Sequence, residues 1–168
     1  MQLLKTEILN NTNLNFNLNI KADKILQNKN FVNIILNSKI HEGLIDVDKT
    51  KFSWKNHANF NLSNSLIYLD ENKLFLDGKL IIDIFDVNEI YKFLLTPKKY
   101  RLGIKKIELN INYNFDKKTI NLADIMIDGK TDNDVNEVLK NIIFKKDNLQ
   151  NKVHIKKILN AAIKSYAG

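Results

Sequence analysis

Cysteine is missing from this 168-residue sequence, and arginine, proline and glycine are scarce. Without cysteine, neither a disulfide nor a thiolate-bound metal can hold the fold. The five glycines form no GxGxxG or GxxxxGK pattern, so a loop that cradles phosphate is absent. No apolar run approaches the roughly 18 residues that a membrane-spanning helix needs. With 44% hydrophobic residues, the chain must instead depend on an ordinary hydrophobic core.

The charge of the chain is strongly positive, with 26 basic and 19 acidic residues and a net charge of +7. Such a balance is typical of proteins that bind nucleic acid or an anionic membrane surface. However, Arg101 is the only arginine, and arginine is the side chain that binds phosphates and guanine edges in a bidentate manner. An aromatic platform for stacking bases is also lacking. We therefore expect no nucleic-acid partner.

The segment NLNFNLNIKA at residues 13–22 alternates strictly between polar and apolar side chains. Successive side chains of a β-strand point to opposite faces, so this segment predicts a strand with one apolar and one polar face. A polar connection is expected at 22–30. Further extended segments lie at residues 31–41, 44–48, 51–54, 57–62, 65–69, 73–85, 104–115 and 119–128.

Helices are predicted in the second half of the chain. Asp86-Val87-Asn88-Glu89 matches a capping box and begins a helix at 87–96, which Pro97 ends. The same DVNE tetrapeptide at 134–137 begins a second helix, and a third follows Asn151 with apolar residues at helical spacing. DGK precedes DVNE in both places, which raises the hypothesis of a duplicated strand-to-helix unit.

These elements predict an α+β fold that is mainly β. Short turns favour antiparallel neighbours, so we expect a curved antiparallel meander, shaped as a groove or half-barrel, of about seven or eight strands with one inserted helix and two C-terminal helices. Residues 1–131 would form the sheet with helix 87–96, and residues 132–168 would form amphipathic helices that pack on it, all in a single domain. Because the alternating pattern begins almost at once, we expect the chain to be a piece of a longer β protein.

Motifs for catalysis and metal binding are lacking. The three histidines, His41, His57 and His154, are far apart in the sequence, and no HExxH motif is present. Residues 46–50 resemble the opening of a calcium loop, but Lys51 stands where that loop needs glycine. Aspartates at strand ends and helix starts have structural roles in turns and caps. We therefore predict a protein that is not an enzyme and that uses no metal or cofactor.

The predicted apolar face is larger than three helices can cover. Seven strands at a spacing of about 4.8 Å make a sheet about 34 Å wide, whereas helices about 15 to 20 Å long would cover only about half the length of the strands. The remaining surface can close by curling of the sheet, pack against further sheet, or bind an apolar ligand such as an acyl chain. The candidate groove residues are Leu14, Phe16, Leu18, Ile20, Leu74, Leu76, Leu80, Ile82, Leu109 and Ile111. Each alone is also typical of an ordinary core position.

Three stretches carry a family resemblance: LFLDGKLIIDIFDVNEIYKFLLTPKK, the following IKKIELNINYNFDKKTINLADIMIDGK, and the closing helix with KKILNAAIKSYAG. Together with the Asn-alternating strands, they resemble the C-terminal region of AsmA-like proteins of Gram-negative bacteria, a group with TamB-like and bridge-like lipid-transfer proteins. The resemblance implies a long β-sheet bent into a groove, along which lipid chains slide. It also implies a periplasmic location, with an inner-membrane anchor in an N-terminal region outside this sequence.

The leading hypothesis is therefore a non-enzymatic domain that handles phospholipid, or another apolar ligand, and maintains the outer membrane or envelope. In the last helix, Lys152, Lys156, Lys157 and Lys164 are predicted to contact anionic headgroups, at about 1 kcal/mol per lysine near a charged surface. Alternatively, they form the solvated face of a helix that covers the sheet. The rival hypothesis is a structural or protein-interaction module with a sealed core, which binds a partner by strand addition at a sheet edge. The sequence identifies no protein partner.

Overall fold

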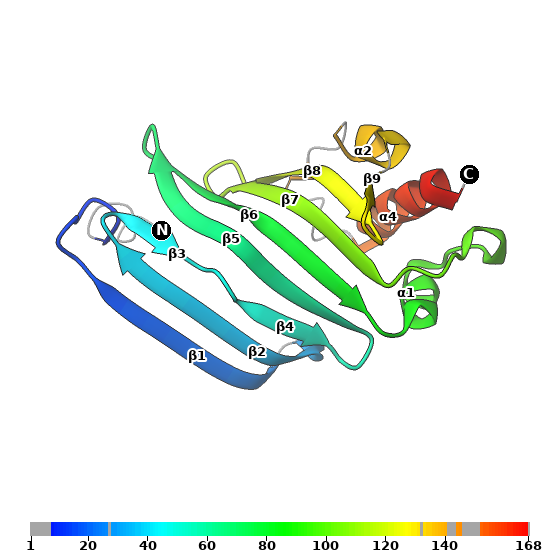
Figure 1. Cartoon of the computed structure of the whole chain (residues 1–168), viewed down its shortest axis with the longest axis horizontal. Helices are drawn as coiled ribbons and strands as arrows, with labels where there is room; N and C mark the ends of the chain where they lie inside the picture. The colour runs from blue at the N-terminus through cyan, green and yellow to red at the C-terminus, as the bar shows by residue number, and fades with distance from the viewer. Residues whose placement is uncertain (1–7, 27, 132, 141–143, 146–151, 168) are drawn as a thin grey trace.

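The fold is an open antiparallel sheet with helices at one side (Figure 1). A computed structural model describes residues 8–26, 28–131, 133–140, 144–145 and 152–167. Its strands are β1 (Phe16–Ile25), β2 (Asn28–His41), β3 (Leu44–Asp46), β4 (Lys51–Trp54), β5 (Ala58–Asp70), β6 (Lys73–Ile84), β7 (Lys106–Asn114), β8 (Thr119–Ile127), β9 (Lys130–Thr131) and β10 (Phe144–Lys145). The helices are α1 (Val87–Leu94), the 3₁₀ turn η2 (Lys98–Tyr100), α2 (Asn133–Lys140) and α4 (Lys152–Ala167).

The strands follow one another across the sheet in the order β1-β2-β3-β5-β6-β7-β8-β10, with every neighbouring pair of described strands antiparallel. β4 pairs with both β2 and β5, and β9 pairs with β8. This arrangement confirms the predicted fold class, a mainly β meander with one inserted helix and helices at the C-terminal end. The short pairing of β10 with β8 had no counterpart in the predicted strands.

Two predicted boundaries were wrong. The polar connection expected at 22–30 is much shorter, because β1 continues to Ile25 and β2 begins at Asn28. The segments 57–62 and 65–69 belong to one strand, β5, which carries an irregularity between Ser63 and Leu66 in its pairing with β6. An irregularity of this kind shifts the alternation by one residue, so the two halves of a single strand look like separate strands in the sequence.

Gly78 allows the sheet to accommodate this irregularity. It lies in the middle of β6, opposite the point where β5 departs from regular pairing. A Cβ atom at position 78 would lie 2.2 Å from Ser65 Oγ and 3.0 Å from Ser65 Cα, and Ser65 is itself buried. A residue without a side chain is therefore required there, because the strand backbones approach too closely for a larger one.

The proposed duplication is not supported by these positions. Gly78 of the first DGK lies within a strand, whereas Gly129 of the second lies in the turn after β8 with a φ of +77°. Asp86 of the first DVNE is the N-cap of α1 and accepts a hydrogen bond from the backbone N–H of Glu89 at 3.3 Å. In the second copy, Asp134 already lies within α2. The two short matches occupy different local structures.

The apolar side chains form two buried groups. The larger group joins β7 and β8 to the C-terminal helices, through Leu109, Ile125, Val135 and Ala162. α2 is attached to β8 by a buried side chain, because Asn136 Oδ1 accepts the backbone N–H of Ile125 at 2.8 Å. The smaller group lies at the other end of the strands and is completed by the segment that precedes β1. The described helices therefore cover the β8 side of the sheet and do not reach the β1 side (Figure 1).

We expect Gly78→Ala to lower the free energy of unfolding by about 1 to 3 kcal/mol, because the added methyl group must displace Ser65 in a tightly packed site. Gly103→Ala is the matched control, since nothing lies within 4 Å of a Cβ placed at position 103. Urea unfolding followed by circular dichroism measures both variants. Equal stability of the two would show that the close approach at Gly78 is not a constraint on the fold.

Candidate functional site

The candidate site is the apolar face of the sheet at its β1 edge. Strand register places Phe16, Leu18 and Ile20 on one face of β1, opposite Ile40, Ser38 and Leu36 of β2. We call Phe16, Leu18 and Ile20 the β1 strip. These three side chains are 41% to 44% exposed, although alternate apolar side chains of a strand are usually buried against a neighbouring layer. Among the described residues, the strip is therefore an exposed part of the apolar face.

The β8 side of the same face is covered. Leu109 and Ile111 of β7 are buried in the larger apolar group, and Leu76, Leu80 and Ile82 of β6 are partly buried against it. Leu109 and Ile111 are therefore core residues in this structure, and a ligand could reach them only if the helices moved. The three β6 residues lie at the boundary between the covered and the open part of the face.

The remaining two candidates belong to the smaller apolar group. Leu74 is completely buried, with 0% exposure, and Leu14 packs against the same group from the segment before β1. Leu9 from this segment is also buried there. The ten groove residues predicted from the sequence thus divide into an open strip on β1, a boundary on β6, core positions at Leu74, Leu109 and Ile111, and Leu14, which is partly buried in the segment before β1.

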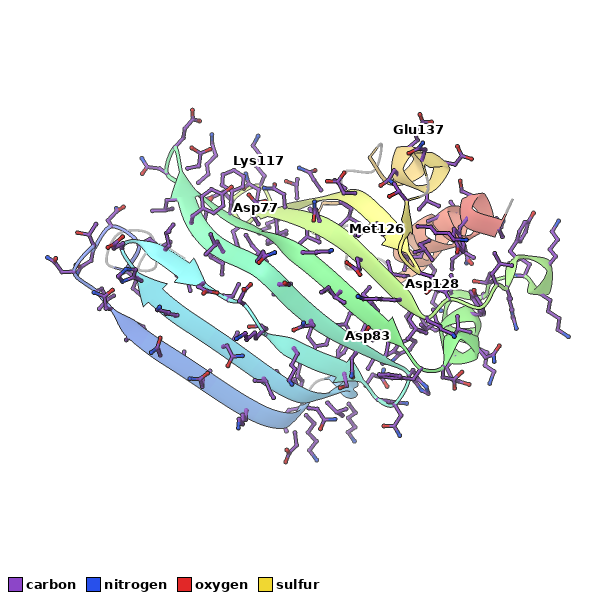
Figure 2. All side chains as sticks on the ribbon, viewed as in Figure 1. Asp77, Asp83, Lys117, Met126, Asp128 and Glu137 are labelled. Atoms are coloured by element: carbon purple, nitrogen blue, oxygen red, sulfur yellow. The ribbon has the colours of Figure 1, made fainter. Side chains whose placement is uncertain are left out.

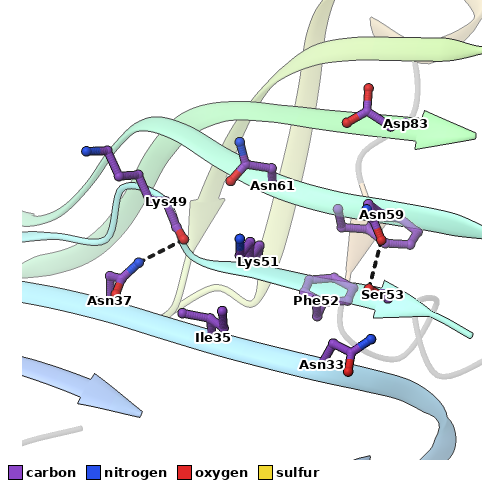
Figure 3. A pocket seen from close by; sticks show the side chains of 11 residues that line it. Asn33, Ile35, Asn37, Lys49, Lys51, Phe52, Ser53, Asn59, Asn61 and Asp83 are labelled. Atoms are coloured by element: carbon purple, nitrogen blue, oxygen red, sulfur yellow. Dashed lines mark hydrogen bonds between the residues drawn. The ribbon is translucent and has the colours of Figure 1, made fainter. Parts of the chain in front are cut away.

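The opposite face of the sheet is polar and hollowed. An open hollow of about 700 Å³ lies over β2, β4 and β5, between Asn33, Asn37, Lys49, Asn61 and Asp83 (Figure 3). Two hydrogen bonds shape it: Asn37 Nδ2 donates to the backbone carbonyl of Lys49 at 2.9 Å, and Ser53 Oγ donates to Asn59 Oδ1 at 2.7 Å. Ile35, Phe52 and Phe60 line the hollow together with amide and charged side chains. None of the ten predicted groove residues lines it, so this hollow is not the predicted lipid groove.

Further polar pairs line the same face toward β7 (Figure 2). The Tyr68 hydroxyl donates a hydrogen bond to Asp77 Oδ2 at 2.7 Å, and Asn112 Nδ2 donates to Asp77 Oδ1 at 2.8 Å. The hydrogen bond to the Asp77 carboxylate, helped by burial, raises the pKa of Tyr68 to about 12. Glu108 pairs with Lys79 and Lys106, which lowers the pKa of the Glu108 carboxyl. This face is therefore a network of hydrogen bonds and ion pairs.

Two of the four lysines predicted to contact headgroups can be placed. Lys156 lies over the ring of Phe93 in α1, with Nζ 4.5 Å from the ring centroid, and Lys164 lies over the ring of Tyr100 at 5.6 Å. Both side chains of α4 thus lie beside the connection between β6 and β7, and not beside the β1 strip. The side chains of Lys152 and Lys157 lie outside the described residues.

The titratable groups of the described residues do not form a metal site, since no three of His, Cys, Asp and Glu gather in a suitable group there. His41 Nδ1 lies 2.5 Å from Asn15 Oδ1, and His57 Nδ1 lies 3.7 Å from Asp86 Oδ2. Asp86 also caps α1, so the partner of His57 has a structural role. The side chain of His154 lies outside the described residues.

Comparison with known proteins gave no match, either among family models, among curated proteins or among solved structures. In the described part of the chain, no helix has both the length and the apolar character required to cross a membrane.

We expect the Tyr68 phenol to titrate near pH 12 and its pKa to fall toward the ordinary value of 10.0 in Asp77→Asn, because the carboxylate that disfavours ionisation is removed. The folded-state pKa lies above the unfolded one, so this pair stabilises the fold below about pH 10 and stops doing so as the pH rises toward 12. NMR of ¹³C-labelled tyrosine, assigned with Tyr68→Phe, measures the shift.

Tyr91 serves as the internal control in this titration. Burial is the main cause of its raised pKa, so Asp77→Asn should leave the Tyr91 signal unchanged. An equal change at Tyr68 and Tyr91 would mean that the substitution loosened the whole sheet and not the single hydrogen bond.

Proposed function

We propose that this protein is a non-enzymatic domain that handles phospholipid through the open part of its apolar sheet face. The observation that carries the proposal is the β1 strip: three large apolar side chains in a row, each 41% to 44% exposed, on a strand of ten residues. Beside them Ile34 and Leu36 of β2 are partly exposed and face the same side. An apolar row of this kind provides a surface for an acyl chain.

The chemistry of the strip favours acyl chains over polar ligands. Its side chains offer no hydrogen-bond donor or acceptor, so they solvate a hydrocarbon chain without reading its headgroup. Such contact makes binding tolerant of lipid type. The neighbouring boundary residues Leu76, Leu80 and Ile82 extend the face toward the covered side. Leu74, Leu109 and Ile111 support the face from within the core.

The resemblance to AsmA-like proteins adds a cellular role to this proposal. It suggests a periplasmic domain, tethered to the inner membrane by an N-terminal region, that takes part in phospholipid transport and maintains the outer membrane. A sheet with one apolar face agrees with that role. The wider activity rests on the resemblance alone, whereas lipid contact at β1 rests on the exposed side chains.

A second candidate function is partner binding by strand addition, and the position of β1 favours it. β1 is the first strand of the sheet order and pairs with β2 along one side, in the part of the chain that the structure describes. The other side of an edge strand presents backbone groups to which a further strand can hydrogen-bond. An added strand would continue the apolar face as well, so the two candidates use the same edge.

The experiment compares the phospholipid that copurifies with the wild-type protein and with Leu18→Asn/Ile20→Asn. Organic extraction followed by mass spectrometry should find phospholipid on the wild type and little or none on the variant, since burying each of these side chains against a chain is worth about 1.5 to 3 kcal/mol. Leu66→Asn is the matched control, because Leu66 is 39% exposed and pairs with Asp46 and Asp77 on the polar face.

Wild-type protein without copurifying phospholipid, or an equal loss from the Leu66 control, would contradict the proposal. A peptide bound in place of lipid, with its amide protons protected from exchange next to β1, would favour strand addition. Circular dichroism of each variant establishes that the sheet is intact.

A further inference from the structure

A second unusual surface lies at the end of the sheet where β6 passes into β7. The connection begins with α1. Residues 95–102 follow it, contain η2 and form a loop that projects from the body of the protein (Figure 1). We call residues 95–102, with the sequence LTPKKYRL, the basic loop. Leu95 at its start is 74% exposed, and Leu102 at its end is 42% exposed. Apolar side chains thus stand at both ends of a strongly basic segment.

The exposure of Leu95 follows from the way α1 ends. Tyr91 and Leu94 occupy the buried side of the helix, and Leu95 is the C-cap residue in the left-handed region with a φ of 61°. Glycine and asparagine are favoured there, because a larger side chain meets its own backbone. A leucine at this position gains neither burial nor a favourable backbone. Fold stability therefore does not account for it.

The loop is held by hydrogen bonds to α1, within itself and to α4. The Tyr91 hydroxyl donates to the backbone carbonyl of Leu102 at 2.5 Å, and Arg101 Nε donates to the carbonyl of Thr96 at 2.9 Å. The buried Thr96 hydroxyl also donates to Asn160 Oδ1 of α4 at 2.5 Å. These contacts bring the two ends of the loop together and keep Leu95 and Leu102 outside the core.

Positive charge gathers around these leucines. Between Ile90 and Lys105 the chain contains Lys98, Lys99, Arg101 and Lys105 and no acidic residue, while Lys92 is paired with Glu89 at 2.5 Å. α4 adds Lys164, which lies over the ring of Tyr100 at 5.6 Å, while Lys99 lies over the same ring at 4.8 Å. Lys156 joins them over the ring of Phe93. The basic loop and α4 together form one cationic surface.

The opposite end of the sheet has a different character. In a meander, alternate turns lie at opposite ends of the strands, so the turns at 42–43, 70–72 and 115–118 share the end away from the basic loop. These turns carry Glu42, Asp70, Glu71 and Asp116 as well as Lys117 and Lys118. Acidic residues occur at both ends, since Asp86, Glu89 and Asp128 lie at the end of the basic loop. The basic loop itself carries cations and exposed leucines and no acidic residue.

We propose that the basic loop docks on the surface of an anionic lipid bilayer. Leu95 and Leu102 enter the boundary between headgroups and acyl chains, and Lys98, Lys99 and Lys164 contact the lipid phosphates. A rigid apolar point surrounded by lysines is the arrangement that binds such an interface, by adding apolar burial to electrostatic attraction. Nucleic acid fits less well, because its phosphates offer nothing to exposed leucines. This docking goes beyond lipid handling at the β1 strip and does not depend on it.

The electrostatic part is tested by co-sedimentation with vesicles of phosphatidylcholine containing about 30% phosphatidylglycerol. Each lysine near such a surface contributes about fivefold to binding, so Lys98→Gln/Lys99→Gln should weaken it by about 25-fold. Lys117→Gln/Lys118→Gln is the matched control, an adjacent lysine pair at the other end of the sheet, and should bind as the wild type does. Raising the salt from about 0.1 to about 0.5 M should also weaken binding.

The apolar part is tested with Leu95→Asn, which suits the left-handed backbone and so preserves the end of α1. It should weaken vesicle binding by about tenfold. Leu44→Asn is the control, because Leu44 is 43% exposed beside the turn at the opposite end. The chain has no cysteine, so an environment-sensitive dye on Leu95→Cys reports insertion directly. Its emission should shift to the blue on adding anionic vesicles, and the dye on Leu44→Cys should not respond.

Equal binding to neutral and anionic vesicles, equal effects of the two lysine pairs, or no shift from the dye at position 95 would each overturn the proposal. Full binding of Leu95→Asn to vesicles, or equal binding of a soluble polyanion, would identify a merely electrostatic surface and overturn it too. Failure here is distinguishable from failure of lipid handling. Copurifying phospholipid is measured without vesicles, and Leu18→Asn/Ile20→Asn should still dock.

Discussion

The alternation of side chains along each strand is the constraint on which this structure depends. In an antiparallel sheet, residues paired across two strands point to the same face, so the register carries one apolar face from Leu18 on β1 to Ile111 on β7. The same register collects the asparagines and charged residues on the other face. Every later property, including which surface is core and which is open, follows from how this apolar face is covered.

The covering is uneven because the helices are attached at one side. α2 is held to β8 by the buried Asn136, and α4 is held to the end of α1 by Thr96 and Asn160. These polar contacts are directional and fix the helices in position, whereas apolar packing alone would tolerate sliding. The β1 side therefore keeps exposed side chains that a sheet covered along its whole width would have buried.

The two proposed surfaces have different physical origins. The β1 strip exists because a neighbouring layer is lacking on that side in the described residues, and its side chains are ordinary strand residues. The basic loop exists because the chain leaves the sheet, ends α1 on a left-handed leucine and returns through a run of cations. The β1 strip offers contact along an apolar row, and the basic loop offers contact at one projecting segment. A lipid-handling domain would use both, one for acyl chains and one for the membrane surface.

The sequence by itself determined the antiparallel meander, most of its strands and the helix starts, because alternation, short turns and capping residues act over a few neighbouring residues. It identified the apolar row of β1 for the same reason. Only the tertiary structure decided that Phe16 is open while Leu74 and Ile111 are core, since Ile111 is buried by helices far along the chain and Leu74 by the segment before β1. It alone brought Lys156 and Lys164 beside the basic loop. Periodicity states which face a side chain occupies, but the packing of distant segments decides whether that face meets protein or solvent.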